Sequence, residues 1–381
     1  MTLHGSPKRR RLLSPPAPAE GVGTLPNELI SEILSRTPAR SVCRFLCVSK
    51  EWYVLICDPA FVAAHKSRHA EPLIVASCSE DEAKSWCRDL RLMDMDGNVV
   101  KVLKRIDGSP LISTSSDDLV CVANYSYSYA NVQVIDPASG KVLVDCPKQQ
   151  HRMVCTFFGS GHAVPSRTYK VVKINDGSVC KVFTVGEDTG WRVSEPPQTK
   201  ISYMENSPVT VNGVLYFLET QHLRGYTLHC FDIERETWRK TISGSHKPMG
   251  PDVCLAVLVA ELNGALCMVQ TERDHTPMTN NRCANIWILA YLDMGTWIKA
   301  YTIPMDASTD YCRPLRVTRD GGKLIFCNTF YAERQEIRAY NLLTKACTSL
   351  CKLDRTMGRI ALCNLQLDRL LSQPRFSVHR S

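Results

Sequence analysis

The sequence predicts an α+β protein with two parts, a small N-terminal domain of three helices and an all-β propeller of about six blades. Two observations lead to this fold class. Residues 24–68 place apolar side chains at helical spacing, whereas residues 88–350 repeat a strand–turn–strand unit roughly every 50 residues. A period of this length, with four short strands in each unit, is typical of propeller blades.

The first 23 residues differ in composition from the rest of the chain. Residues 1–23 are rich in Pro, Ser, Gly, Ala and Arg and show no periodicity, so they are expected to form a disordered tail. The basic cluster of Lys8, Arg9, Arg10 and Arg11 is either a nuclear localisation signal or a solubilising segment. The net charge of +8 is otherwise spread thinly, so direct nucleic-acid binding is not expected.

Residues 24–68 are predicted to be helical. The first helix carries one apolar face, formed by Leu25, Leu29, Ile30, Ile33 and Leu34. Thr37-Pro38 ends this helix, because a residue that precedes proline avoids the helical region. Ser41 and Ser49 are expected to cap two further helices, and Asp58-Pro59 marks the start of another turn.

Residues 71–371 are predicted to form the propeller, followed by a short C-terminal tail, 372–381. The six repeated units cover 88–106, 131–147, 180–197, 228–241, 286–304 and 337–350. A second set of hairpins, at 209–218, 260–269 and 318–327, turns at Asn-Gly or Gly-Gly, which tolerate positive φ angles. Two hairpins in each unit supply the four strands of a blade.

Two further features bear on how the blades pack and close. Trp191, Trp238 and Trp297 follow the turn in three of the units, and we expect each to pack between neighbouring blades. A last strand around Ile360 to Leu367 is a candidate to close onto the first unit, which is poorly marked and leaves the blade count open by one.

The 18 cysteines are scattered and include no Cys-x-x-Cys pair. Because the N-terminus lacks an apolar signal region and the longest apolar run is 253–260, we expect no membrane span and a nuclear or cytoplasmic location. The thiols are then expected to be reduced and mostly buried. Cys43/Cys47 and Cys347/Cys351 have no nearby zinc-ligand histidine, and His65/His69 is interpreted as a solvated helix end rather than a metal site.

The stretch LPNELISEILSRTPARSVCRFLCVSKEW (25–52) resembles the F-box, and LICDPAFVAAH (55–65) resembles its continuation in the large plant F-box group. The phrases FDIERETWRK and IWILAYLDMGTWIKAYTI make the rest of the chain similar to the F-box-associated domain, a kelch-like β-propeller. The resemblance implies that the F-box docks on a Skp-family adaptor, and through it on a cullin. By position, the implied adaptor contacts are Leu25, Pro26, Leu29, Ile33, Leu34, Pro38, Val42, Leu46, Val48 and Trp52, although Leu46 and Trp52 could instead hold the helices together.

The same resemblance implies a substrate-recognition subunit of a Skp–cullin–F-box ubiquitin ligase, whose propeller binds a protein target for degradation. A nuclear interaction or regulatory scaffold that delivers no substrate is the alternative, and a propeller enzyme is a weaker third. The longer irregular segments 125–131, 219–226, 271–285 and 330–336 are candidates for the target-binding loops, or are simply solvated loops.

The chain is not expected to be an enzyme or to bind a cofactor or metal. It contains no Gly-x-Ser-x-Gly, no Walker-type loop and no Gly-x-Gly-x-x-Gly. DGGK (320–323) is predicted to be a hairpin turn, because a strand rather than a helix follows it. In this interpretation the protein contributes proximity and orientation to a reaction that its partners catalyse.

Overall fold

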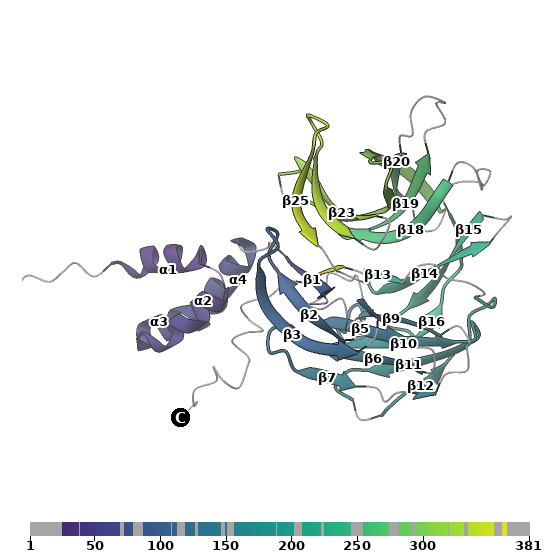
Figure 1. Ribbon diagram of the computed structural model, residues 1–381. Helices are drawn as coiled ribbons and strands as arrows, with labels where there is room; N and C mark the ends of the chain where they lie inside the picture. The colour runs from purple at the N-terminus through teal and green to yellow at the C-terminus, as the bar shows by residue number, and fades with distance from the viewer. Residues whose placement is uncertain are drawn as a thin grey trace, which may run out of the picture. The chain divides into compact units, whose positions relative to one another are not determined.

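The computed structural model describes residues 25–37, 39–68, 72–78, 87–107, 109–112, 119–125, 129–145, 149–150, 156–187, 189–201, 208–221, 225–244, 254–273, 282–291, 295–318, 320–330, 334–353 and 360–363. The chain divides into two compact units, Met1–His69 and Ala70–Ser381, which are described separately (Figure 1). Both expected tails, including Lys8 to Arg11, and Pro38 lie outside the described residues.

The first unit is helical. It contains α1 (Asn27–Ser35), α2 (Ala39–Arg44), the short 3-10 helix η1 (Phe45–Cys47), α3 (Lys50–Cys57) and α4 (Pro59–Arg68). Two predicted caps are confirmed: the Ser49 hydroxyl accepts a hydrogen bond from Trp52 N at 3.2 Å, and Asp58 Oδ1 accepts one from Ala60 N at 2.7 Å. The helix after Asp58 is a full helix of its own, α4. The expected cap at Ser41 is wrong, since α2 already begins at Ala39 and good helix formers precede the serine.

The packing of α4 against α1 fixes which side of α1 is buried. His65 donates from Nε2 to the Thr37 carbonyl at 2.7 Å, and Arg68 pairs with Glu32 at 2.7 Å. His65 is 1 % exposed, so its interpretation as part of a solvated helix end is wrong. His69 lies outside the described residues. The helical unit therefore uses α4 to cover one face of α1 and leaves the other face open.

The second unit is a six-bladed propeller of antiparallel sheets, which confirms the predicted fold class (Figure 1). Blade 1 holds β26 (Ala361–Cys363), β1 (Leu73–Cys78), β2 (Cys87–Met93) and β3 (Val99–Asp107). Blade 2 holds β4 (Ser109–Ile112), β5 (Val120–Tyr125), β6 (Tyr129–Ile135), β7 (Val142–Asp145) and the short β8 (Gln149–Gln150). Blade 3 holds β9 (Thr156–His162), β10 (Tyr169–Asn175), β11 (Val179–Thr184) and β12 (Arg192–Ser194).

The remaining blades follow the same plan. Blade 4 holds β13 (Val209–Val211), β14 (Val214–Gln221), β15 (Gly225–Asp232), β16 (Thr237–Trp238) and the short β17 (Ile242–Ser243). Blade 5 holds β18 (Cys254–Leu262), β19 (Ala265–Arg273), β20 (Arg282–Tyr291) and β21 (Thr296–Met305). Blade 6 holds β22 (Thr309–Val317), β23 (Lys323–Phe330), β24 (Gln335–Asn341) and β25 (Cys347–Leu353).

Blade 1 is assembled from both ends of the domain. The C-terminal β26 pairs antiparallel with β1, and Val75 lies opposite Ala361. The late strand predicted to close onto the first unit therefore does so. This closure settles the blade count at six and joins the two ends of the ring by backbone hydrogen bonds.

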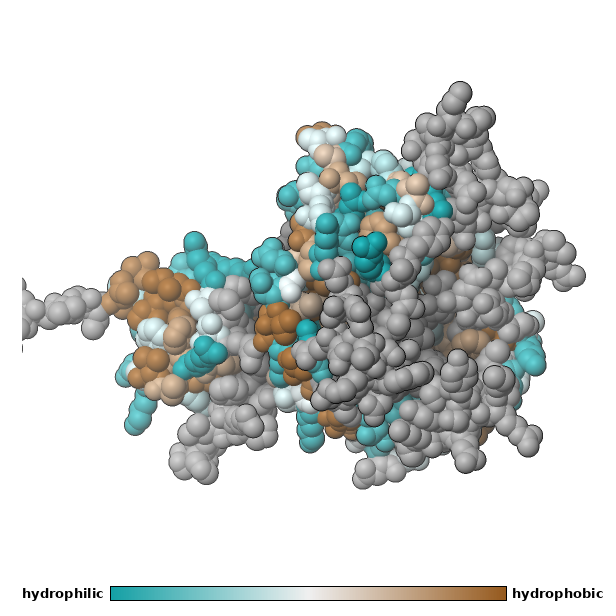
Figure 2. All heavy atoms as spheres, in the orientation of Figure 1, coloured by the Kyte–Doolittle hydropathy of each residue, from teal (hydrophilic) through white to brown (hydrophobic). Residues whose placement is uncertain are grey.

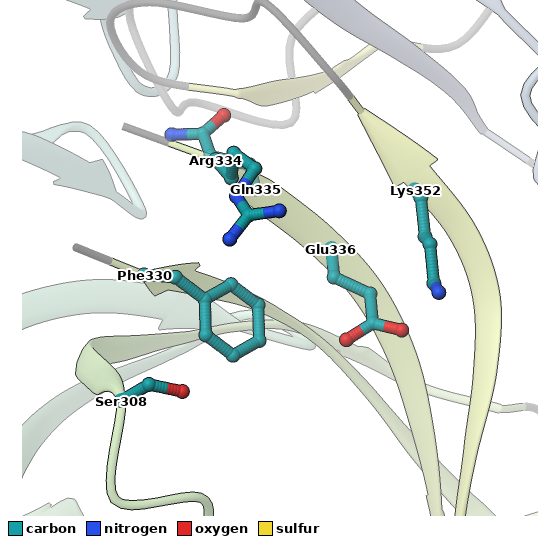
Figure 3. Close-up of a pocket in the computed structure, with 6 residues that line it drawn as sticks. All are labelled: Ser308, Phe330, Arg334, Gln335, Glu336 and Lys352. Carbon is teal, nitrogen blue, oxygen red and sulfur yellow. The ribbon is translucent and has the colours of Figure 1, made fainter. Parts of the chain in front are cut away.

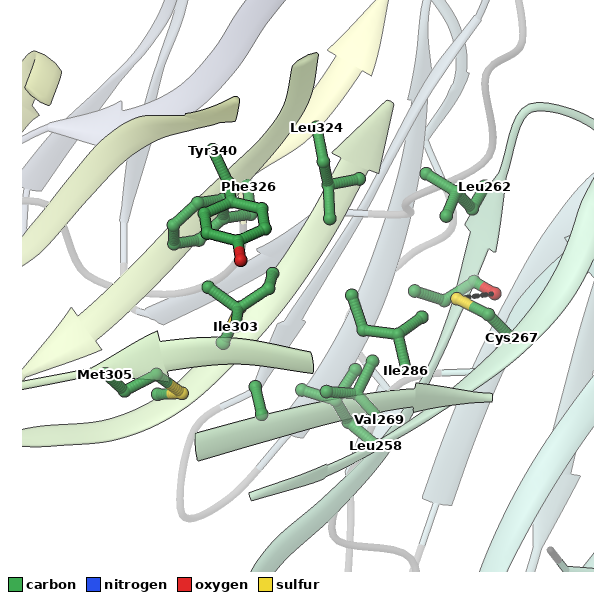
Figure 4. Close-up of a cluster of buried hydrophobic side chains, with 13 residues drawn as sticks. Leu258, Leu262, Cys267, Val269, Ile286, Ile303, Met305, Leu324, Phe326 and Tyr340 are labelled. Atoms are coloured by element: carbon green, nitrogen blue, oxygen red, sulfur yellow. Dashed lines mark hydrogen bonds between the residues drawn. The ribbon is translucent and has the colours of Figure 1, made fainter. Parts of the chain in front are cut away.

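The core of the propeller lies between its blades. Six clusters of buried apolar side chains occupy the six interfaces between neighbouring sheets. Figure 4 shows the cluster between blades 5 and 6, where Leu258 and Ile286 face Phe326 and Tyr340. Each blade thus buries both of its faces, which explains the long apolar runs in strands such as β18.

The tryptophans lie where the sequence predicts, between blades. Trp238 donates from Nε1 to the Glu195 carbonyl of the preceding blade at 2.9 Å, and Trp297 does the same to Ser243 at 3.0 Å. Trp191 packs against the cluster that blades 2 and 3 share.

The predicted hairpin turns are also confirmed: φ is positive at both positions of Asn212-Gly213 and of Asn263-Gly264.

A partly buried charge cluster links blades 3 and 4 and gives a prediction for acid stability. Glu236 accepts hydrogen bonds from Lys170 Nζ at 2.8 Å and from Arg192 Nη2 at 2.7 Å. Burial would raise the pKa of Glu236, but the hydrogen bonds from the two cations outweigh it and hold this pKa below its ordinary value of 4.5. The stabilisation is present above the pKa of the unfolded chain and is lost as the pH falls through the lower, folded-state value.

We expect Glu236→Gln to lower the melting temperature at neutral pH, since Lys170 is then buried without its carboxylate partner. As the pH falls below the ordinary glutamate pKa of 4.5, the variant should lose less further stability than the wild type, because it has no carboxylate to protonate there. Circular dichroism melts over this pH range measure both effects. If the melting temperatures of the two proteins fall equally with decreasing pH, Glu236 is not the group responsible for this acid sensitivity.

Candidate partner-binding surfaces

An exposed apolar strip is formed by Leu25, Leu29 and Ile33. Leu29 and Ile33 are four apart in α1 and so lie on the same side of the helix, whereas Leu25 lies just before the N-cap residue Pro26. Their side chains are 55 %, 50 % and 55 % exposed. Pro26 is exposed beside them, and Val48, after η1, is 56 % exposed. Figure 2 shows apolar residues gathered on the surface of the helical unit, as is typical of a site that another chain covers.

The other implied contact residues are placed differently. Leu34 and Val42 are buried at 2 % and 0 % exposure, so in this structure they belong to the core of the helical unit. Leu46 and Trp52 are half-buried, and the Trp52 ring meets Phe45 edge-on with centroids 5.6 Å apart. The adaptor-contact set thus stays a prediction, and its solvent-facing members are Leu25, Pro26, Leu29, Ile33 and Val48.

Sequence reasoning missed one further exposed apolar residue of the helical unit. Val54 on α3 is 69 % exposed, the largest exposure among the large apolar residues in the described part of this unit. The signal was present in the run Trp52 to Ile56, five consecutive apolar residues, since a helix that packs on one side cannot bury five in a row.

The four candidate target-binding segments share one position in the propeller topology. They join the second strand of a blade to the third: β5 to β6, β14 to β15, β19 to β20 and β23 to β24. Because successive strands of a blade run in opposite directions, all four connections emerge on the same face of the propeller, here called the candidate face. The tight Asn212-Gly213 and Asn263-Gly264 turns lie on the opposite face. The tips of the four segments lie outside the described residues.

One of these segments lines a pocket. The pocket has a volume of about 230 Å³ and is lined by Ser308, Phe330, Arg334, Gln335, Glu336 and Lys352 (Figure 3). Its lining comes from three places in blade 6: the turn before β22, the connection from β23 to β24, and the end of β25. The candidate face therefore has at least one concave site with charged side chains.

The buried cysteines are unsuited to nucleophilic chemistry. Burial raises the pKa of Cys180 and of Cys267 to about 12, so these thiols stay protonated at neutral pH. Most of the described cysteines are buried, as the sequence predicts.

In the described part of the chain, no three His, Cys, Asp or Glu side chains group as metal ligands. None of its helices is long and apolar enough to cross a membrane.

Comparison with known families matches both units. Residues 24–63 match the F-box domain, and residues 61–352 match the F-box associated beta propeller domain. "F-box protein At5g65850" of Arabidopsis thaliana is 25 % identical over 305 residues, which are 78 % of this chain and 76 % of the relative. "F-box protein At5g49610" of the same plant is 27 % identical over 295 residues, covering 71 % and 77 % of the two chains.

A solved structure supports the architecture alone. TolB from Acinetobacter baumannii aligns with a TM-score of 0.50 at 9 % identity, covering 83 % of this chain and 73 % of TolB. At this identity the likeness concerns the fold and carries no information about function.

Proposed function

Because this chain belongs to the F-box proteins that carry an F-box-associated β-propeller domain, we propose that it is the substrate-recognition subunit of a Skp–cullin–F-box ubiquitin ligase. The helical unit docks on a Skp-family adaptor, which links it to a cullin. The propeller holds a protein target for ubiquitination and degradation.

The apolar strip is the observation that carries this proposal. Leu25, Leu29 and Ile33 are each about half exposed, and the other face of the helix that carries Leu29 and Ile33 is already packed. Burying an aliphatic side chain completely contributes about 1.5–3 kcal/mol. If a partner covers these three half-exposed side chains together with Val48 and Val54, the buried apolar surface contributes several kcal/mol to the free energy of binding. The isolated helical unit does not gain this stabilisation.

The chain's contribution to the reaction is positional. It holds the target close to a conjugating enzyme that other subunits recruit, which raises the effective concentration of the acceptor lysine. F-box and propeller domains are typical of such non-catalytic adaptors. We place its action in the nucleus or the cytoplasm. The alternative role, a scaffold that delivers no substrate, is not favoured by any described feature.

Complex formation tests the proposal. The full chain is mixed with a purified Skp-family adaptor and a cullin, and size-exclusion chromatography with light scattering measures the mass of the product. We expect one stable complex containing one copy of each subunit. If the chain elutes alone at micromolar concentrations, the proposed assembly is wrong and the apolar strip covers some other surface.

A further inference from the structure

The pocket on blade 6 combines an apolar wall with cations that face solvent. Figure 3 shows the Phe330 ring and the Arg334 guanidinium on one side of the pocket, and Glu336 and Lys352 on the other. Phe330 is half-buried at the end of β23, whereas Arg334 and Lys352 are exposed. The pocket thus offers a hydrophobic surface and positive charge within one concave site.

The charges in and around the pocket are unevenly matched. Glu336 lies opposite Lys352 in the β24–β25 register and 3.9 Å from Arg338 Nε, and Arg338 also pairs with Asp306 at 2.8 Å. Within the described part of the chain, Arg334 makes no ion pair. An exposed guanidinium at the mouth of a pocket is well suited to bind a carboxylate through two parallel hydrogen bonds.

The size of the pocket limits what can enter it. A volume of about 230 Å³ lies below the 300–1,000 Å³ of typical small-molecule sites, so it suits one or two side chains of a longer ligand. Ser308, which is exposed on the blade-connecting turn, adds a hydroxyl that can hydrogen-bond a peptide backbone.

We propose that this pocket binds an acidic peptide segment of the ubiquitination target. An Asp or Glu side chain pairs with Arg334 and is also attracted by Lys352, while a neighbouring apolar side chain packs on Phe330. This inference rests on the proposed function, because it assumes that the bound peptide belongs to the protein to be ubiquitinated.

A peptide array tests the proposal directly. The probe is a set of synthetic octapeptides in which the two central residues run through all pairs in a randomised background, and the full chain is applied at micromolar concentration. We expect pairs of Asp or Glu with Leu, Ile, Phe or Trp to be enriched among the bound peptides. Absence of any acidic preference would overturn the proposal.

Variants assign the preference to the pocket. For an enriched octapeptide measured by fluorescence anisotropy, Arg334→Gln should weaken binding about tenfold and Lys352→Gln several-fold, while Arg334→Lys should have an intermediate effect. Lys323→Gln is the matched control, since Lys323 is an exposed cation at the other end of β23. Unchanged binding in Arg334→Gln would overturn the assignment. The assignment would also be overturned if the preference for acidic peptides were lost only when Lys8 to Arg11 are replaced with Gln. That result would show that the acidic peptides bind the tail.

Adaptor binding, measured on the same preparations, separates the two proposals. If the chain binds the adaptor but shows no preference for acidic peptides, only the proposal for the pocket is rejected. If the chain binds no adaptor but still prefers acidic peptides, and Arg334→Gln abolishes that preference, the ligase role is rejected and the pocket remains a peptide site.

Discussion

Replacing Leu29 with Asp should weaken the complex with a Skp-family adaptor at least 100-fold. Leu29 lies at the centre of the apolar strip and is 50 % exposed, so the substitution leaves the helical unit folded. In the complex, however, the carboxylate would be buried without a partner, at a cost of several kcal/mol. Asp is too short to extend its charge to the edge of the interface as Lys can. Titration calorimetry gives the change in affinity.

Two comparisons make this result specific. Leu343→Asp places the same charge at an 89 % exposed leucine of the propeller and should leave adaptor binding unchanged. Leu29→Met keeps the side chain apolar and of similar size and should bind within a few-fold of the wild type. If Leu29→Asp binds as tightly as Leu343→Asp, the strip is not part of the interface.

The second large effect concerns the stability of the propeller. Gly177, in the turn between β10 and β11, has a φ of +66°, and a Cβ there would collide with the carbonyl oxygen of Ile201. The same residues are joined by a hydrogen bond from Ile201 N to Gly177 O at 3.0 Å, so the two segments cannot separate freely. Gly177→Ala should therefore cost about 3 kcal/mol or more, combining left-handed backbone strain with the displaced contact.

Gly264→Ala provides the matched control. Gly264 has a φ of +83° in an equivalent hairpin turn, but a Cβ there would meet nothing within 4 Å. This variant should lose only the conformational part, about 1–2 kcal/mol. In a domain of this size each kcal/mol lowers the melting temperature by about 2–4 °C, so calorimetric melts can distinguish the two. Equal losses would show that the backbone at Ile201 yields to the new methyl group.

Most features that depend on neighbouring residues were predictable from the sequence, the expected cap at Ser41 being the exception. The caps at Ser49 and Asp58 are fixed within three residues, and the Asn212-Gly213 turn requires only that both positions tolerate positive φ. The repeated units predicted the blades for the same reason, because each unit carries its own turns and alternating strands. Even closure by β26 could be anticipated, since the first unit lacks one strand of its own.

Features that depend on distant residues were not predictable. Ile33 and Leu34 are neighbours in one apolar run, yet Ile33 is 55 % exposed and Leu34 only 2 %. The difference is set by α4, whose His65 and Arg68 reach back about 30 residues to Thr37 and Glu32. The blade 6 pocket likewise needs Ser308, Arg334 and Lys352 brought together from two connections and a strand end, and no local pattern contains that information.

The thermodynamic signature of adaptor binding tests the central claim most directly. Titration calorimetry of the full chain with a Skp-family adaptor, at several temperatures and two salt concentrations, reports both the affinity and the heat-capacity change. An interface built on Leu25, Leu29 and Ile33 predicts tight binding with a clearly negative heat-capacity change and little dependence on salt. Absence of binding, or binding that salt abolishes and that shows no heat-capacity change, would contradict an apolar docking site on the F-box.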